Sequence, residues 1–231
     1  MFYRQLKCSL IVLIVTFCSN CFAQNKYGLH AIGFDEYLNS LVQSPEKELV
    51  NLETYIPGLM VDVRYATTNN FTGKKIYTLA RAYARKPVAK ALREIEKELG
   101  ANGYGLKIFD GYRPYSATVK FYETYHDTTF VASPYSGSKH NRGCALDLTL
   151  IKKSNGKELK MPTAYDAFLK EASPTFPVKN KKAKTNRDLL IRVMARHGFK
   201  VYENEWWHFD FVGWEQYEVM DIDFEELEKQ Y

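Results

Sequence analysis

Hydrophobic and polar positions follow two different spacings along the chain, and each spacing predicts a different kind of element. The clearest helical pattern begins at Lys86 and Pro87, continues with apolar residues three and four apart, and ends at Gly100. Proline is favoured in the first helical turn and glycine at the end, so this helix has both a start and a stop. Weaker helical patterns predict further helices over residues 34–42, 115–125, 163–172, 185–197 and 224–229.

Alternating apolar and polar residues predict strands over residues 59–65, 106–109, 144–150 and 199–202. The strand over 144–150 is the most informative, because successive side chains of a strand point to opposite faces. One of its sides is made of Cys144, Leu146, Leu148 and Leu150, and the other of Ala145, Asp147 and Thr149. One face therefore belongs to the core, and the other presents a carboxylate.

The order of these elements favours an α+β fold, with an antiparallel or mixed sheet and helices mainly on one face. Helices and strands interleave without the regular βαβ rhythm of a parallel sheet. The open face of the sheet is the expected place of a functional site. The lysine-rich run 179–184 is interpreted as a solvated loop before a helix that Thr185 and Asp188 begin as a capping box; binding to an anionic wall polymer is the alternative.

Residues 1–23 have the pattern of a cleaved secretory signal. Basic residues precede a short apolar run, and small residues lead up to a cut after Ala23. The apolar run is much shorter than the roughly 20 residues that a membrane-spanning helix needs. We therefore expect export to the periplasm, a single domain over residues 24–231 and no stable membrane span in the mature chain. A lipoprotein anchored at Cys21 is the alternative.

Cleavage of this signal changes the charge and the cysteine content. The whole chain of 231 residues carries a formal net charge of +5 and four cysteines. Without Arg4 and Lys7, 30 basic residues remain against 27 acidic ones, a net charge of +3, and Cys144 is the one cysteine left. This balance gives no electrostatic footprint for nucleic acid, and one cysteine cannot form a disulfide framework. The fold is therefore expected to depend on its hydrophobic core.

Two short stretches combine residue types that bind zinc. In the first, His140 precedes a glycine turn, and Asp147 follows that turn on a strand. In the second, His208 ends the run Glu205-Trp206-Trp207-His208. Zinc binds both histidine nitrogen and carboxylate oxygen, and three protein ligands leave its fourth position open, as in catalytic sites. The sequence therefore indicates a catalytic site with one zinc ion per chain.

Four motifs occur along the chain in a fixed order. They are the segment Asp62–Phe71, Asp-Gly-Tyr-Arg-Pro at 110–114, Ser-x-His-x-x-Gly-x-Ala-x-Asp at 138–147 and Glu-x-x-His at 205–208. Together they resemble the zinc D-Ala-D-Ala dipeptidases of the VanX type, within the wider group of zinc D,D-peptidases. The resemblance implies a zinc hydrolase whose partner is a small dipeptide substrate.

The resemblance further implies that His140, Asp147 and His208 are the zinc ligands and that Glu205 is the general base. A carboxylate beside the metal's water can take a proton from it and pass that proton to the leaving amine. In a regular strand Glu205 and His208 would point to opposite faces, because side chains alternate. We therefore expect a bulge or bend between these two residues.

Two more residues match positions of the family that act on the substrate, and a third is expected in the same pocket. Arg113 matches the arginine that stabilises the transition state, and a forked, permanently charged guanidinium suits an oxyanion or a substrate carboxylate. Asp166 resembles the residue near the substrate's free amino group. Ser138 is expected to line the same pocket.

With the export signal, the resemblance implies a secreted zinc metallopeptidase that hydrolyses D-Ala-D-Ala to two D-alanine molecules, in cell-wall turnover or D-alanine scavenging. One alternative is a zinc D,D-carboxypeptidase or endopeptidase that acts on longer muropeptides. A non-catalytic zinc-binding module and a lectin-like wall-binding protein are the alternatives of a different class. Glu205 and Arg113 argue against the non-catalytic module, because a structural metal needs neither of them.

Overall fold

The structure is a computed structural model that describes residues 26–229. The predicted signal, residues 1–23, lies outside this range, so its cleavage and the single domain over 24–231 stay predictions. Among the described residues, no helix has both the length and the apolar character to cross a membrane.

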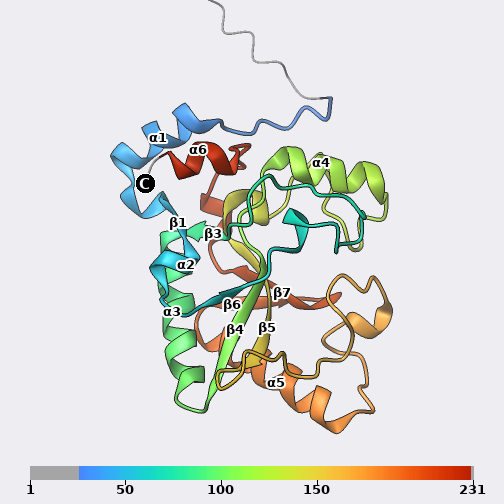
Figure 1. The fold of residues 1–231 in the computed structure, drawn as a ribbon. Helices are drawn as coiled ribbons and strands as arrows, with labels where there is room; N and C mark the ends of the chain where they lie inside the picture. Colours follow the sequence, from blue (N-terminus) through green and yellow to red (C-terminus); the bar gives the residue numbers. More distant parts are fainter. Residues whose placement is uncertain (1–25, 230–231) are drawn as a thin grey trace, which may run out of the picture.

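A five-stranded mixed sheet forms the centre of the fold (Figure 1). Its strands lie in the order β2 (Met60–Val61), β4 (Tyr104–Asp110), β5 (Ala145–Lys152), β7 (Glu205–Phe211) and β6 (Phe199–Tyr202). β2 runs parallel to β4, whereas the other neighbouring strands pair antiparallel. The predicted α+β class with a mixed sheet is confirmed.

Two long helices pack against this sheet, α3 (Lys86–Gly100) against β4 and α5 (Lys181–Arg196) against β6. A second, two-stranded sheet pairs β1 (Leu49–Asn51) with β3 (Tyr83–Arg85). Figure 1 shows α3 along one side of the central sheet and α5 at the lower end of the molecule. The helix predicted from Lys86 to Gly100 is confirmed.

Shorter helices and turns connect these parts. The helices are α1 (Phe34–Gln43), α2 (Leu52–Tyr55), α4 (Tyr115–Thr124) and α6 (Phe224–Glu228). The 3-10 turns are η1 (Pro45–Lys47), η2 (Arg64–Ala66), η3 (His140–Arg142), η4 (Lys170–Ala172) and η5 (Trp214–Gln216). α1, α4 and α6 confirm three predicted helices, and Figure 1 shows them at the end of the molecule opposite α5.

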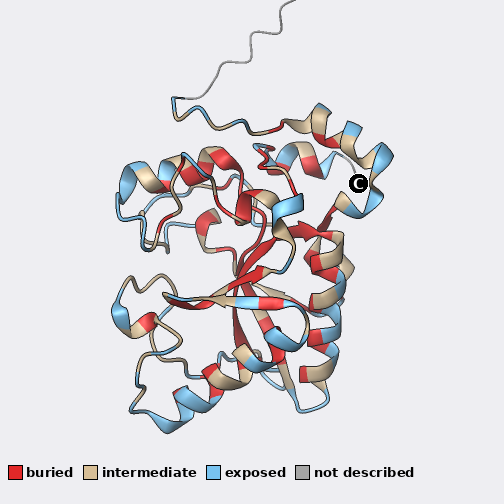
Figure 2. Ribbon diagram, turned by 180° about the vertical axis from the view of Figure 1, so that it is seen from behind, coloured by how far each residue is buried: buried red, intermediate tan, exposed pale blue. Residues whose placement is uncertain are grey.

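The apolar side of β5 belongs to one hydrophobic core. Leu146, Leu148 and Leu150 are completely buried, and they share this core with apolar residues of α3 and α5 such as Leu92 and Leu190. Figure 2 shows buried residues along the central strands and exposed residues on the outer sides of the helices. Burial of one leucine side chain stabilises a fold by about 1.5–3 kcal/mol, so this core firmly supports the polar side of β5.

Two predicted elements are largely absent. The strand predicted over residues 59–65 is reduced to β2, because the chain turns into η2 and buries the Tyr65 ring. The helix predicted over 163–172 does not form, and only η4 remains of it. Asp166 has a φ of +55°, a left-handed backbone conformation that interrupts a right-handed helix.

α5 begins earlier than predicted. Its N-cap is Asn180, whose side chain accepts a 3.0 Å hydrogen bond from the backbone N–H of Ala183. Asparagine is among the most favourable N-cap residues, so the helix begins at Lys181 and the predicted cap Thr185 lies inside it. The prediction of a loop was therefore wrong for most of the lysine-rich run, which forms the first helical turn.

Gly143 is expected to be indispensable for stability. It follows η3 with a φ of +69°, and a Cβ atom there would lie 2.6 Å from Cδ2 of Leu49 and 3.2 Å from Cγ of Arg85. The Gly143→Ala variant should lose about 2–5 kcal/mol of unfolding free energy, from left-handed strain and overpacking together. Urea unfolding measures this loss. Gly58→Ala is the control, because Gly58 has a φ of +85° with no atom within 4 Å; equal losses would contradict the steric argument.

Candidate active site

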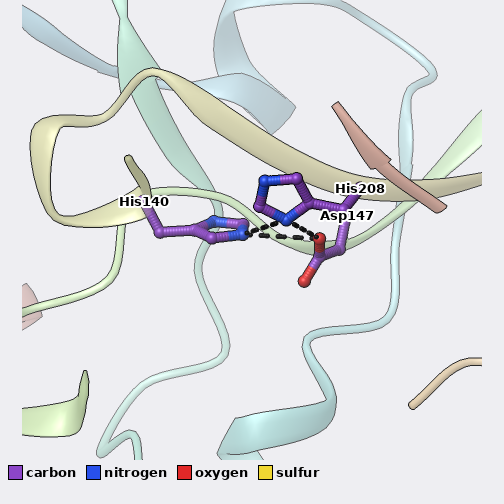
Figure 3. A group of neighbouring side chains, drawn as sticks. All are labelled: His140, Asp147 and His208. Carbon is purple, nitrogen blue, oxygen red and sulfur yellow. Dashed lines mark hydrogen bonds and ion pairs between the residues drawn. The ribbon is translucent and has the colours of Figure 1, made fainter. Parts of the chain in front are cut away.

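Three side chains from separate parts of the chain converge on one point. His140 is the first residue of η3, Asp147 lies on β5, and His208 lies opposite Asp147 on β7. Figure 3 shows one nitrogen of each ring and one oxygen of Asp147 directed towards one another. Nε2 of His140 lies 3.2 Å from Nδ1 of His208 and 3.4 Å from Oδ1 of Asp147. Nδ1 of His208 and Oδ1 of Asp147 are 3.1 Å apart.

These spacings fit a tetrahedral zinc ion. Donor atoms about 2.0–2.1 Å from a shared tetrahedral centre lie roughly 3.3–3.4 Å from one another, which is close to the three distances. Two imidazoles and one carboxylate are also ligand types that zinc accepts, and three protein ligands leave a fourth position for water or substrate. Within residues 26–229, these three form a group whose donor atoms all lie within 4.8 Å of each other.

The segment around η3 fixes the orientation of His140. Nδ1 of its ring lies 2.7 Å from the carbonyl oxygen of Gly111, so Nδ1 donates a hydrogen bond and Nε2 keeps its lone pair for the cluster. The backbone N–H of His140 donates to Oγ of Ser138 at 3.2 Å. The predicted residue Ser138 therefore supports the turn that carries His140.

Asp147 is buried and contacted from several sides. The Tyr165 hydroxyl donates to its Oδ2 at 3.0 Å, and Nη2 of Arg113 lies 3.8 Å from the same oxygen. Burial alone would raise the pKa of Asp147, but the imidazoles of His140 and His208 outweigh burial and hold it below its usual range. Asp147 is therefore ionised at neutral pH and able to bind a cation.

His208 lies between two carboxylates. Its Nδ1 is 3.1 Å from Oδ1 of Asp147, and its Nε2 is 2.9 Å from Oδ1 of Asp210. Burial disfavours the charged ring, but the hydrogen bonds with Asp147 and Asp210 raise the pKa of His208 to about 10. A metal ion needs the lone pair of the neutral ring, so binding of the ion to Nδ1 displaces a proton.

A bulge in β7 brings Glu205 beside this cluster. The register between β6 and β7 shifts, so that residues 206–208 have no partner on β6. The bend predicted between Glu205 and His208 is therefore confirmed, and Oε2 of Glu205 lies 3.8 Å from Nδ1 of His208. Burial raises the pKa of Glu205 to about 8, with His208 opposing the rise and Asp147 adding to it.

Arg113 is held by Asp110 at the end of β4. Its Nε and Nη2 donate to Oδ2 of Asp110 at 3.0 and 2.8 Å, and the guanidinium lies 4.7 Å from the ring centroid of Phe121. The hydroxyl of Tyr77 donates to Oδ1 of Asp110 at 2.9 Å. Burial disfavours the charge on Arg113, but Asp110, Tyr77 and Tyr65 hold its pKa well above the ordinary value.

The residues of the site line one cavity of about 520 Å³. In its wall, the carboxylate of Asp166 is held by the Tyr65 hydroxyl, which lies 3.1 and 3.2 Å from its two oxygens. Burial, together with the charge of Asp147, raises the pKa of Asp166 to about 8. All seven residues that the sequence singled out line this cavity: Arg113, Ser138, His140, Asp147, Asp166, Glu205 and His208.

Three polar residues that hold the predicted ones in place were not predicted as part of the site: Tyr65, Tyr165 and Asp210. Asp110, which holds Arg113, lies in the motif at 110–114. Asp210 lies two positions after His208. Because successive side chains of a strand point to opposite faces, this spacing indicates that both lie on one face. Tyr65 and Tyr165 lie in the two segments whose secondary structure was predicted wrongly, and the local pattern there gave no sign of their contacts.

Comparisons with known proteins identify a peptidase family. The chain matches a peptidase family described as D-Ala-D-Ala dipeptidase, peptidase family M15, over residues 45–226. The D-alanyl-D-alanine dipeptidase of Escherichia coli (strain K12) is 35% identical over 167 residues, which are 72% of this chain and 86% of the relative. The D-alanyl-D-alanine dipeptidase of Enterococcus faecalis (strain ATCC 700802 / V583) is 32% identical over 187 residues, covering 72% of this chain and 93% of the relative.

Among solved structures, the vancomycin resistance D,D-dipeptidase VanXYg in complex with a D-Ala-D-Ala phosphinate analog gives a TM-score of 0.38 at 20% identity. That match covers 72% of this chain and 67% of the other. Peptidases of the matched family depend on zinc, in agreement with the two imidazoles and the carboxylate found here. The family match includes every residue of the cluster and most of the chain. The chain therefore belongs to the D-Ala-D-Ala dipeptidase family of hydrolases.

Proposed function

We propose that this protein is a zinc-dependent dipeptidase that hydrolyses D-Ala-D-Ala to two D-alanine molecules. His140, Asp147 and His208 would hold one zinc ion per chain. The observation that carries the proposal is the tetrahedral spacing of their three donor atoms, 3.1 to 3.4 Å apart, beside the buried carboxylate of Glu205. The relatives named above support the choice of substrate.

Glu205 acts as the base and then as the acid of this reaction. Bound zinc supplies Lewis acidity, which polarises a carbonyl group and lowers the pKa of water. Glu205 takes one proton from the attacking water as the water oxygen bonds to the peptide carbon. It returns that proton to the nitrogen as the C–N bond breaks, so the products are two free amino acids. Burial raises the pKa of Glu205 above that of an ordinary carboxyl, towards the neutral range in which one group can both take up and return a proton.

Arg113 stabilises the negative charge that develops on the carbonyl oxygen during attack. Its guanidinium lines the cavity and lies 3.8 Å from Asp147, so it borders the point where the three ligands converge. The charge is fixed in place by Asp110 before substrate arrives. A preorganised cation of this kind lowers the barrier because little reorganisation is needed during the reaction.

Asp166 supports a dipeptidase over a carboxypeptidase for longer peptides. Its half-buried carboxylate lines the same cavity as the ligands and Glu205, and within residues 26–229 its side-chain hydrogen bonds come from the Tyr65 hydroxyl and not from a cationic group. A free ammonium group of a dipeptide would favour the ionised form of this carboxyl and pair with it. An acylated amino group, as in a longer peptide, carries no positive charge, so this ionic contact would be lost.

The proposed function also includes a location for the protein, the periplasm. The pattern of residues 1–23 supports export to the periplasm, where the substrate would come from the wall and the role would be D-alanine scavenging or wall turnover. A reporter fused behind residues 1–30 tests the export. Retention of the reporter in the cytoplasm would contradict this part of the proposal and leave the chemistry untouched.

The proposed reaction is tested with zinc-loaded protein, D-Ala-D-Ala and, in parallel, a muropeptide that ends in D-Ala-D-Ala. Release of D-alanine from the dipeptide alone, lost after chelation and regained with zinc, is the expected result. Release mainly from the muropeptide would keep the mechanism and replace the dipeptidase by a carboxypeptidase. Tight zinc binding without release from either substrate would favour the non-catalytic zinc-binding module.

The Asp166→Asn variant is expected to lose selectivity for a free amino terminus. Asparagine tolerates the left-handed φ of +55° and can still accept the hydrogen bond from Tyr65. It removes one charge-assisted contact, worth about 1.5–3 kcal/mol, so kcat/KM for D-Ala-D-Ala should fall about 10–100-fold. The kcat/KM for N-acetyl-D-Ala-D-Ala, measured alongside, should not fall. Equal losses for both substrates would show that Asp166 does not contact the amino group.

A further inference from the structure

One ion pair beside the metal ligands has no part in the function proposed above. Asp210 and His208 lie two positions apart on β7, and both are directed to the face of the sheet that carries Asp147. Oδ1 of Asp210 lies 2.9 Å from Nε2 of His208, and Oδ2 of Asp210 lies 2.7 Å from Nζ of Lys139. The contacts therefore run in a line from Lys139 through Asp210 to His208.

The ring of His208 requires such a partner if its other nitrogen is to hold an ion. Nδ1 is the nitrogen that faces His140 and Asp147, so Nε2 must carry the ring's proton when Nδ1 offers its lone pair. Asp210 accepts the hydrogen bond from Nε2, which selects this tautomer and fixes the plane of the ring.

Lys139 holds Asp210 in place in the same way. Because Lys139 lies next to a proposed ligand in the chain, this contact also links two parts of the metal site. Lys139 directly precedes His140 in the sequence, and its Nζ lies 5.3 Å from the centroid of a ring of Trp214. The pair of Lys139 and Asp210 therefore joins the segment that carries one proposed ligand to the strand that carries another. Asp210 is almost buried, with an 11% exposed side chain, so solvent screens the pair less than an ordinary surface pair.

We propose that Asp210 and Lys139 are positioning residues for zinc: Asp210 orients His208, Lys139 orients Asp210, and the pair sets the zinc affinity of the site. The proposal rests on the metal site of the proposed function, but it does not depend on which peptide is cleaved. Neither residue needs to touch the substrate or the ion.

Zinc affinity of the folded protein is the direct test. Metal-free protein is titrated with zinc against a chromophoric chelator, and each variant's thermal unfolding without metal is recorded beside it. Asp210→Ala should weaken zinc binding about 10–100-fold. Asp210→Asn should weaken it less, because the amide oxygen can still accept from Nε2. Lys139→Met should weaken it by a smaller factor, and Lys139→Arg should restore it, because the positive charge returns.

A matched control shows whether the loss of any paired lysine charge weakens zinc binding. Lys107 on β4 forms a comparable pair with Glu158, 3.1 Å between Nζ and Oε1. Lys107→Met should leave zinc affinity unchanged. The visible absorption of cobalt-substituted protein gives a second readout, since a reoriented His208 changes the ligand field, whereas a loss of stability alone does not.

Wild-type zinc affinity and an unchanged cobalt spectrum in Asp210→Ala would overturn the proposal. If that variant does not fold, the Lys139→Met and Lys139→Arg variants decide: equal affinity in both would overturn it as well. A wild-type protein that binds zinc but cleaves neither peptide would refute the proposed function, while weaker zinc binding in the Asp210 variants would still support the positioning role. The two failures are therefore distinguishable.

Discussion

The Glu205→Gln variant is expected to hydrolyse D-Ala-D-Ala with a kcat about 10²–10⁴-fold below that of the wild type. Glutamine has nearly the shape of glutamate, but its amide cannot take a proton from water or return one to the leaving nitrogen. Oε2 of Glu205 lies 3.8 Å from Nδ1 of His208, and Glu205 is not one of the three side chains whose donors converge. Zinc binding should therefore persist, and the loss should appear in kcat.

Steady-state rates of D-alanine release and the zinc content of the same samples measure this effect. In the wild type, kcat/KM should fall towards low pH as the base becomes protonated, and the residual activity of Glu205→Gln should lack this dependence. Glu203→Gln is the matched control, because Glu203 is exposed in the turn just before β7. A Glu205→Gln enzyme that keeps more than about a tenth of the wild-type kcat would exclude Glu205 as the general base.

The convergence of His140 and Asp147 could be predicted because it depends on local features. Gly143 allows the chain to reverse, with a φ of +69°, and strand alternation then directs Asp147 away from the leucine side. The fold class was predictable for a similar reason, since the helix Lys86–Gly100 and the strand after Cys144 have strong periodic patterns. Where hydrophobic spacing and turn chemistry agree, the sequence specifies the element without knowledge of distant contacts.

The place of Asp166 could not be predicted from such patterns. Its partner Tyr65 lies 101 residues earlier in the chain, and its left-handed backbone replaces the helix that the local spacing suggested. Tyr165, the next residue back, is likewise held by Asp147, 18 residues away. Both are tertiary contacts, and they outweigh the weak helical propensity of residues 163–172.

The Arg113→Lys variant is expected to lose about 10²–10³-fold in kcat, with a much smaller change in KM. Nε and Nη2 of Arg113 both donate to Asp110, so the planar group is fixed on one side while it borders the cavity. A lysine ammonium is a single point of charge and cannot pair with Asp110 and also reach an oxyanion from the same position. The developing charge would therefore lose its donor, whereas binding of the uncharged ground-state carbonyl would change little.

A comparison with Arg113→Met separates this catalytic effect from a loss of stability. Methionine leaves the buried carboxylate of Asp110 without its cation, and breaking a buried pair in this way costs roughly 3–5 kcal/mol. Lysine retains a charge for Asp110, so Arg113→Lys should unfold close to the wild type in urea and still be a poor enzyme. If Arg113→Lys instead keeps a kcat within about threefold of the wild type, Arg113 acts through the stability of Asp110 alone, because a role in the transition state requires the forked guanidinium.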